Sequence, residues 1–208
     1  MSDNYQTEQE AFWAGDFGNA YADRNDGVQL IADNLSFFNK VLAQADPIKS
    51  LIEFGSNIGL NLQTLNLMFP DVEKKAVEIN KYAAEKLKEI QNTEVFNGSI
   101  FDYEIDKTYD LSFTRGVLIH LNPDKLDLVY EKLYQSSHKY IVVAEYYSKN
   151  PISLKYHNEE NKLFLRDFAG EIMDKYNDLK LIDYGFVYYR DRKYPHDDIT
   201  WFLMEKTK

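Results

Sequence analysis

Apolar residues follow two alternating patterns along this chain. Short apolar runs are typical of strands buried in a parallel sheet, and longer segments with helical periodicity are typical of amphipathic helices. The runs predict strands at residues 50–54, 75–79, 94–97, 109–114 and 140–144. The periodic segments predict helices at residues 27–45, 59–68, 81–90, 123–136 and 167–176. Two last strands, at 179–189 and 198–205, follow each other without a helix.

This order of elements predicts the fold class. Strands that alternate with helices form a parallel sheet covered on both faces, and two consecutive strands form an antiparallel hairpin. We therefore expect a single α/β domain with a doubly wound, mostly parallel seven-stranded sheet and a C-terminal antiparallel hairpin. Residues 1–46 form its helical cap, in which a short helix and a loop precede helix 27–45, and residues 47–208 form its core.

A glycine-containing turn follows the first predicted strand. Gly55 permits a tight turn, and Asn57, which tolerates positive φ, stands where related turns carry a second glycine. Gly59 would let the next helix pack closely on the strand. Glu53, near the end of the strand, and Ser56 face the same turn. The pattern is typical of the Rossmann-like turn that binds a cofactor through backbone N–H groups at a helix start.

An acidic residue ends the second predicted strand. Glu78 follows the glycine turn by about 20 residues, the spacing at which Rossmann-like sites hold ribose hydroxyls with a carboxylate. A solvated charge at a strand end is the alternative. Because the glycine turn precedes Glu78, we favour ribose binding and expect the adjacent Ile79 to contact the same cofactor.

Composition excludes several classes of protein. The chain of 208 residues has a formal net charge of −10 and no cysteine. An acidic chain is a poor partner for nucleic acid, and the lack of cysteine excludes disulfides and thiolate chemistry. No apolar run reaches membrane-spanning length and the N-terminus is no signal peptide, so we expect a cytoplasmic protein with no membrane partner. Neither a metal-ligand spacing nor a serine nucleophile elbow is visible.

Five strands, a glycine turn after the first, an acid after the second and a terminal hairpin together resemble the class I methyltransferases. That fold binds S-adenosylmethionine at the carboxyl ends of its strands. The resemblance implies that Ser99 and Ile100, after the third strand, contact adenine, and that Arg115, after the fourth, lies behind the methionine part of the cofactor. We expect Tyr21 and Arg24 of the cap to close over the cofactor, with a surface position as the alternative for Arg24.

Nearly the whole chain resembles the methylases associated with pseudaminic acid biosynthesis. The strings that carry this resemblance are residues 10–18, 55–61, 116–123, 145–147, 166–170 and 183–188. The resemblance implies methyl transfer to a small polar acceptor, such as a nonulosonic-acid-type sugar or its precursor.

Candidate catalytic residues follow the fourth and fifth strands. Methyl transfer from a sulfonium is an in-line displacement, which requires positioning of the acceptor and removal of its proton if it has one. His120, in the loop after the fourth strand, is a candidate general base, and a histidine that only shapes its loop is the alternative. Glu145 and Tyr146, at the end of the fifth strand, are candidates to orient the acceptor.

Two later loops gather cations in this acidic chain. Arg166 and Arg190 predict that the acceptor is an anion held by paired hydrogen bonds, and Trp13 and Tyr147 are further candidates for acceptor contact. The alternative is a pair of solvated loops whose cations bind neighbouring carboxylates.

Two other functions stay open from the sequence. The chain could bind S-adenosylmethionine without catalysis, because binding and catalysis share the same residues. A nicotinamide-dependent Rossmann enzyme is less favoured, since the turn lacks the full three-glycine fingerprint. The acceptor atom and the oligomeric state are not predicted.

Overall fold

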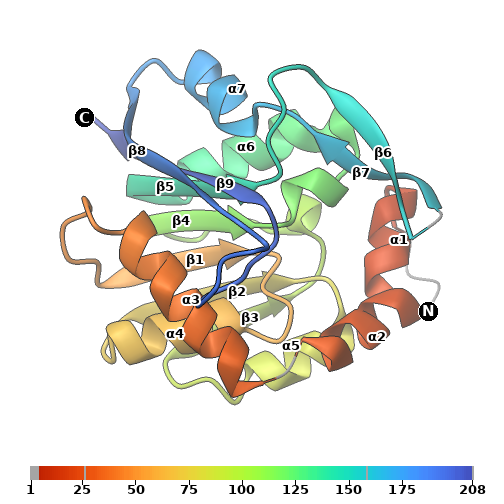
Figure 1. Ribbon diagram of the computed structural model, residues 1–208, viewed down its shortest axis with the longest axis horizontal. Helices are drawn as coiled ribbons and strands as arrows, with labels where there is room; N and C mark the ends of the chain where they lie inside the picture. Colours follow the sequence, from red (N-terminus) through yellow and green to blue (C-terminus); the bar gives the residue numbers. More distant parts are fainter. Residues whose placement is uncertain (1–4, 26, 158, 208) are drawn as a thin grey trace.

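The computed structural model describes residues 5–25, 27–157 and 159–207. Its main sheet has seven strands in the order β3-β2-β1-β4-β5-β9-β8 (Figure 1). The first five strands are parallel, and β9 pairs antiparallel with both β5 and β8. The strand bounds are β1 Ser50–Phe54, β2 Glu73–Glu78, β3 Thr93–Asn97, β4 Tyr109–Arg115, β5 Ser137–Glu145, β8 Leu179–Val187 and β9 Ile199–Lys206. The predicted fold class, including the C-terminal hairpin, is confirmed.

Helices cover both faces of the sheet because successive strand residues point to opposite sides. Leu51 of β1 packs into the cluster that contains Phe38 and Leu62, and the adjacent Ile52 packs into the cluster that contains Val129 and Ile172. The helices of the first face are α3 Val28–Val41, α4 Leu60–Met68 and α5 Lys81–Leu87. Those of the second are α6 Leu126–Gln135, preceded by the 3-10 turn η3 Pro123–Lys125, and α7 Phe168–Lys175.

The N-terminal segment contains two helices where a short helix and a loop were expected. Helix α1, Glu8–Ala14, begins with a capping box between Thr7 and Glu10, and α2, Asp16–Arg24, follows after Gly15. Gly18 lies inside α2, and a Cβ atom there would come within 1.9 Å of the Trp13 carbonyl oxygen. This glycine therefore permits close packing of the two helices, and it does not mark a loop.

A second, two-stranded sheet was not predicted. Strands β6, Ile152–Tyr156, and β7, Glu159–Leu165, form a hairpin that extends from the main sheet to α1 (Figure 1). Gln9 Nε2 donates to the Asn161 carbonyl at 2.9 Å, and Lys162 pairs with Glu8 at 3.1 Å. The hairpin thus fastens the N-terminal helices to the end of the sheet. Residues 152–156 do alternate between apolar and polar side chains, so β6 carried a strand signal that the prediction missed, whereas the residues of β7 do not alternate.

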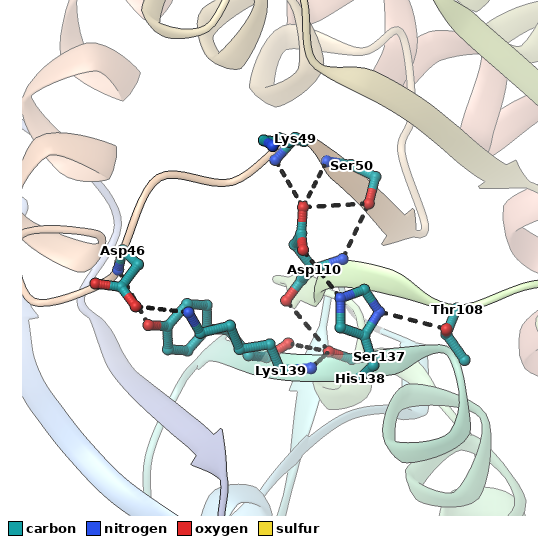
Figure 2. Close-up of polar contacts among 9 residues, drawn as sticks. Asp46, Lys49, Ser50, Thr108, Asp110, Ser137, His138 and Lys139 are labelled. Carbon is teal, nitrogen blue, oxygen red and sulfur yellow. Dashed lines mark hydrogen bonds and ion pairs between the residues drawn. The ribbon is translucent and has the colours of Figure 1, made fainter.

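A polar network ties the amino ends of β1, β4 and β5 together (Figure 2). One carboxylate oxygen of Asp110 accepts hydrogen bonds from the backbone N–H groups of Lys49 and Ser50, and the other contacts His138 Nε2 at 2.9 Å. The half-exposed His138 therefore lies at the end of the sheet opposite to the carboxyl ends. The carboxyl ends carry the cavity described next.

Candidate functional site

A cavity of about 590 Å³ lies at the carboxyl ends of β1, β2 and β4. The turn after β1 and the two N-terminal helices line it, together with the end of the loop before β9. Its volume falls within the roughly 300–1,000 Å³ of small-molecule sites. The predicted site residues that line it are Trp13, Tyr21, Gly55, Ser56, Asn57, Glu78, Ile79, Ser99, Ile100, Arg115 and His120.

The turn after β1 has the backbone conformation expected from its glycines. Gly55, Asn57 and Gly59 all have positive φ, at 77°, 48° and 81°. A Cβ atom on Gly55 would lie 2.5 Å from the Val117 side chain, so any larger residue would displace the loop after β4. Gly59 does not line the cavity. A Cβ atom on Gly59 would meet the side chains of Leu87, at the end of α5, and Ile90.

Glu78 ends β2 and is held by the backbone on both sides. Its Oε2 accepts from Asn57 N–H and its Oε1 from Asn80 N–H, each at 2.7 Å. Burial raises the pKa of this carboxyl, and the two amide hydrogen bonds oppose that rise. An ionised carboxylate has about four acceptor positions, so two stay available for a ligand in the cavity.

Asn80 joins this strand end to the N-terminal helices. Its Nδ2 donates to the Trp13 carbonyl at 3.2 Å and to Asn19 Oδ1 at 2.9 Å. On the neighbouring loop, Ser99 Oγ accepts from Phe101 N–H and begins the 3-10 turn η1, Ile100–Asp102. Ser99 and Ile100 therefore form a wall of the cavity next to Glu78.

Arg115 lies in a polar cluster where α3 and α4 approach the end of β4. Its Nη1 donates to Asn34 Oδ1 at 2.6 Å and to Asn61 Oδ1 at 2.8 Å. Asn61 Nδ2 donates in turn to Glu53 Oε1 at 2.7 Å, while Glu53 Oε2 is buried without a hydrogen-bond partner among the described residues. Burial raises the pKa of Glu53 to about 8. Glu53 lies behind the cavity and does not line it.

His196 completes this cluster from the loop before β9. Its Nε2 lies 2.8 Å from the Asp33 carbonyl, which can only accept, so Nε2 carries the proton. Its Nδ1 then accepts from Arg115 Nη2 at 3.0 Å. Burial and the adjacent guanidinium lower the pKa of His196, which favours this neutral form.

His120 has the opposite tautomer. Its Nδ1 lies 2.7 Å from the Lys162 carbonyl and must donate to it, so Nε2 has a free lone pair. Burial lowers the pKa of His120 to about 4, and the ring is neutral at pH 7. The 3-10 turn η2, Leu118–His120, carries this side chain to the cavity.

Glu145 positions the loop of His120 from outside the cavity. Its Oε1 accepts from the backbone N–H groups of Val117 and Leu118 at 3.0 and 3.1 Å. The carboxylate is buried among these amides and does not line the cavity, so direct contact with an acceptor, expected from the sequence, is not what this geometry provides. Burial raises the pKa of Glu145 to about 7.

Aromatic rings form the wall around His120. The centroid of the Trp13 ring lies 4.8 Å from that of His120 and 5.2 Å from that of Tyr21. The ring centroid of Tyr156, in β6, lies 4.7 Å from that of His120. These rings come from α1, α2, η2 and the β6–β7 hairpin. The hairpin and the N-terminal helices thus meet around His120, where Trp13 and Tyr21 line the cavity and Tyr156 lies outside the lining.

The other predicted residues lie outside the cavity lining. Arg166 Nε binds Glu171 at 2.7 Å, and the exposed Arg190 lies over the Tyr189 ring at 5.1 Å. The exposed Arg24 lies 5.9 Å from the Tyr21 ring, and the exposed Tyr147 lies 6.0 Å from Phe202. The full set outside the lining is Arg24, Glu53, Gly59, Glu145, Tyr146, Tyr147, Arg166 and Arg190.

Several cavity residues carry no signal that sequence reasoning could use. Asn34, Asn61, His196 and Asp197 are ordinary polar residues of helices and a loop, and only the fold brings them to the cavity. Gln9 and Glu10 are buried at its edge. Within the described ranges no cluster of His, Asp and Glu could hold a metal ion, and no helix there is long and apolar enough to cross a membrane.

Comparison with solved structures gives the fold a name. The chain matches the Burkholderia thailandensis 1,6-didemethyltoxoflavin-N1-methyltransferase with a TM-score of 0.67 and 14% identity over 95% of this chain and 88% of the other. It matches the plantazolicin methyltransferase BpumL with a TM-score of 0.66 and 11% identity over 96% and 94%. The chain has the class I methyltransferase fold.

A third match is the methyltransferase domain of bacterial CtHen1, with a TM-score of 0.65 and 16% identity over 86% of this chain and all of the other. The first two neighbours were crystallised with S-adenosylhomocysteine. No protein-family profile and no curated protein matches this sequence. The expected kinship with pseudaminic-acid methylases therefore stays a prediction.

Proposed function

We propose that this protein is an S-adenosylmethionine-dependent methyltransferase that acts on a small polar molecule. The observation that carries the proposal is Glu78, a buried carboxylate at the end of β2 whose two oxygens are fixed by Asn57 and Asn80 and face a cavity of about 590 Å³. Two remaining acceptor positions on one carboxylate suit the vicinal hydroxyls of a ribose. A catalytic methyltransferase and a protein that only binds the cofactor share this feature.

The neighbouring residues suit the rest of the cofactor. Ile79, Ser99 and Ile100 form a partly apolar wall next to Glu78, which suits adenine. On the other side, Gly55 leaves room for close approach to the backbone, and Arg115 supplies a positive charge for the methionine carboxylate. In this assignment Tyr21 closes the cavity from α2.

When bound, the cofactor supplies an electrophilic methyl group. The protein must then hold the acceptor in line with that methyl and exclude water. His120 suits the first task, because its Nε2 lone pair is free and its ring orientation is fixed by the Lys162 carbonyl. The rings of Trp13 and Tyr21, which line the cavity, suit the second. A sugar acceptor, expected from the family resemblance, stays a candidate substrate.

Replacement of Glu78 tests the cofactor assignment. Glu78→Ala removes a charged hydrogen-bond acceptor, which costs about 1.5–3 kcal/mol of binding free energy. Calorimetry with S-adenosylhomocysteine should show this loss in Glu78→Ala and wild-type affinity in Glu89→Ala, which removes an exposed carboxylate outside the cavity. Wild-type affinity in Glu78→Ala would contradict the assignment.

Two further measurements separate the alternative functions. Mass spectrometry of ligands that copurify with the protein would reveal S-adenosyl nucleosides or, for the less favoured Rossmann enzyme, nicotinamides. Release of S-adenosylhomocysteine from S-adenosylmethionine during turnover would separate a methyltransferase from a protein that only binds the cofactor.

A further inference from the structure

The loop between β8 and β9 delivers a carboxylate to the cavity. His196 fixes the end of this loop through hydrogen bonds to the Asp33 carbonyl and to Arg115. The next residue, Asp197, lines the cavity, and its carbonyl accepts from Ile199 N–H at 2.7 Å as β9 begins. The position of Asp197 is therefore set on both sides by the fold.

Asp197 has no ion pair with any Lys or Arg of the described ranges. Arg115 is the buried cation nearest the cavity, but its hydrogen bonds go to Asn34, Asn61 and His196. The negative charge of Asp197 acts on Arg115 and His196 and on three phenols. Its negative charge contributes, after burial, to the raised pKa of Tyr21, Tyr146 and Tyr156. The Tyr146 hydroxyl also hydrogen-bonds to Asp197, and the remaining acceptor positions of the carboxylate can bind a ligand that donates hydrogen bonds or carries positive charge.

The surrounding wall has the same preference. Trp13 and Tyr21 line the cavity with aromatic rings, whose π-faces attract cations, and His120 presents a lone pair. An anionic acceptor would face Asp197, and Arg115, the cation that lines the cavity, is already assigned to the methionine carboxylate. The cationic loop residues Arg166 and Arg190, expected to hold an anion, lie outside the cavity lining. The exposed Arg24 lies over the rings of Phe17 and Tyr21 and is the remaining cation nearby.

We propose that the methyl acceptor is a small amine and that Asp197 binds its nitrogen. This inference rests on the proposed methyl transfer. One N–H of the free-base amine donates to the Asp197 carboxylate and a second donates to His120 Nε2, which leaves the nitrogen lone pair for the methyl group.

The charge balance of the reaction explains why a carboxylate beside the acceptor nitrogen would assist methyl transfer. The nitrogen lone pair forms the N–C bond, the C–S bond breaks, and its electron pair stays on sulfur as the neutral thioether. The positive charge moves from sulfur to nitrogen, and the product leaves as an N-methylammonium that keeps its protons. A carboxylate beside the nitrogen stabilises this developing charge. No base has to remove a proton during transfer, and His120, a weak base with a pKa of about 4, is adequate as a hydrogen-bond acceptor.

The test uses probes with matched skeletons and S-adenosylmethionine labelled at the methyl group. The probes are 2-phenylethylamine, 2-phenylethanol and 3-phenylpropionate, with cyclohexylmethylamine, cyclohexylmethanol and cyclohexanecarboxylate as a second set. We expect labelled product from the amines alone. Asp197→Asn should lower kcat/KM for the amine by about 10- to 100-fold, the value of a charge-assisted hydrogen bond, without a change in S-adenosylhomocysteine affinity.

Two variants serve as controls. Asp198→Asn makes the same charge change one residue away, outside the cavity lining, and can keep the hydrogen bond that Asp198 Oδ1 accepts from Tyr189 N–H. It should retain wild-type turnover. Asp197→Glu keeps the charge and should recover part of the activity lost in Asp197→Asn.

Three results would overturn the inference. The first is methylation of the alcohols or acids alone, and the second is that no amine of either set is labelled. The third is an equal loss of amine turnover and of S-adenosylhomocysteine affinity in Asp197→Asn. Failure of the wild-type protein to bind S-adenosylhomocysteine would instead refute the proposed function. Binding of S-adenosylhomocysteine without amine methylation refutes only the amine acceptor.

Discussion

The two ends of the cavity are built in different ways. The end assigned to the cofactor comes from consecutive strand–turn–helix units, and its main contact joins Asn57 to Glu78, 21 residues apart. The end assigned to the acceptor joins segments from the whole chain. His120 binds the Lys162 carbonyl 42 residues away, and His196 binds the Asp33 carbonyl 163 residues away.

The two ends also differ in the groups they present. The cofactor end presents backbone N–H groups and one carboxylate held by them, in a turn that requires glycine at position 55. The acceptor end presents rings whose positions depend on one another, since Trp13 contacts both Tyr21 and His120. A fold can therefore keep the first end while the second changes with the substrate. This division explains why a chain with 11–16% identity to the neighbours described above shares their fold without revealing its acceptor.

The largest expected effect is at the cofactor end. Gly55→Val places a β-branched side chain at φ 77° and against Val117, which costs on the order of 3 kcal/mol or more of folding free energy and fills space expected to hold the cofactor. Calorimetry should detect no S-adenosylhomocysteine binding. Gly27→Val is the control, because Gly27 also has a positive φ but does not line the cavity. Nothing lies within 4 Å of a Cβ atom built on Gly27, so this variant should still bind S-adenosylhomocysteine. Normal binding by Gly55→Val would mean that the turn has been misassigned.

Trp13→Ala should separate the two ends. Its ring is half-buried, so its removal should cost about 2–3 kcal/mol of folding free energy, less than a fully buried aromatic residue. The loss of its contact with His120 should lower kcat while S-adenosylhomocysteine affinity changes little. Phe17→Ala removes a ring of the same N-terminal helices that does not line the cavity, and it should affect stability more than kcat. Equal losses of cofactor affinity and kcat in Trp13→Ala would show that the ends are not independent.

Glu53 lies behind the cavity, and its ionisation should make stability depend on pH. The folded protein keeps its proton up to a pKa of about 8, whereas the unfolded chain loses it near 4.5. The folded state therefore binds more protons between these values, and the free energy of unfolding falls as pH rises. From pH 6.5 to 8 the loss in urea unfolding should be about 1–2 kcal/mol larger in the wild-type protein than in Glu53→Gln, which keeps the loss expected from Glu145 with its raised pKa of about 7. Parallel curves for both proteins would contradict the assigned burial effect.

The smallest effects are expected from the outlying arginines. Arg190→Gln and Arg166→Gln should each leave cofactor affinity and acceptor KM within about twofold of wild type, because neither side chain lines the cavity. Arg166→Gln should lose up to about 1 kcal/mol of stability with its pair to Glu171. A clear rise of acceptor KM in either variant would restore the anionic acceptor expected from the sequence and contradict the amine.

Much of the fold follows from the sequence because its signals are local. Apolar runs such as residues 109–114 identify buried strands, and helical periodicity identifies the segments between them. The turn at Gly55 and the acid at Glu78 depend on backbone conformation and strand ends, both of which short stretches of sequence specify. The seven main strands and the fold class could thus be predicted, with helix ends that differ by a few residues.

The tertiary structure decided the acceptor end. Gly18 lies where a loop was expected, yet it permits α1 and α2 to pack, and the β6–β7 hairpin was missed although residues 152–156 alternate between apolar and polar side chains. Glu145 was expected to orient the acceptor from the end of β5, but its carboxylate binds the backbone amides of residues 117 and 118. The role of a polar side chain depends on which distant groups surround it. Sequence periodicity reports whether a residue is buried, and only the folded chain determines the partner that it meets there.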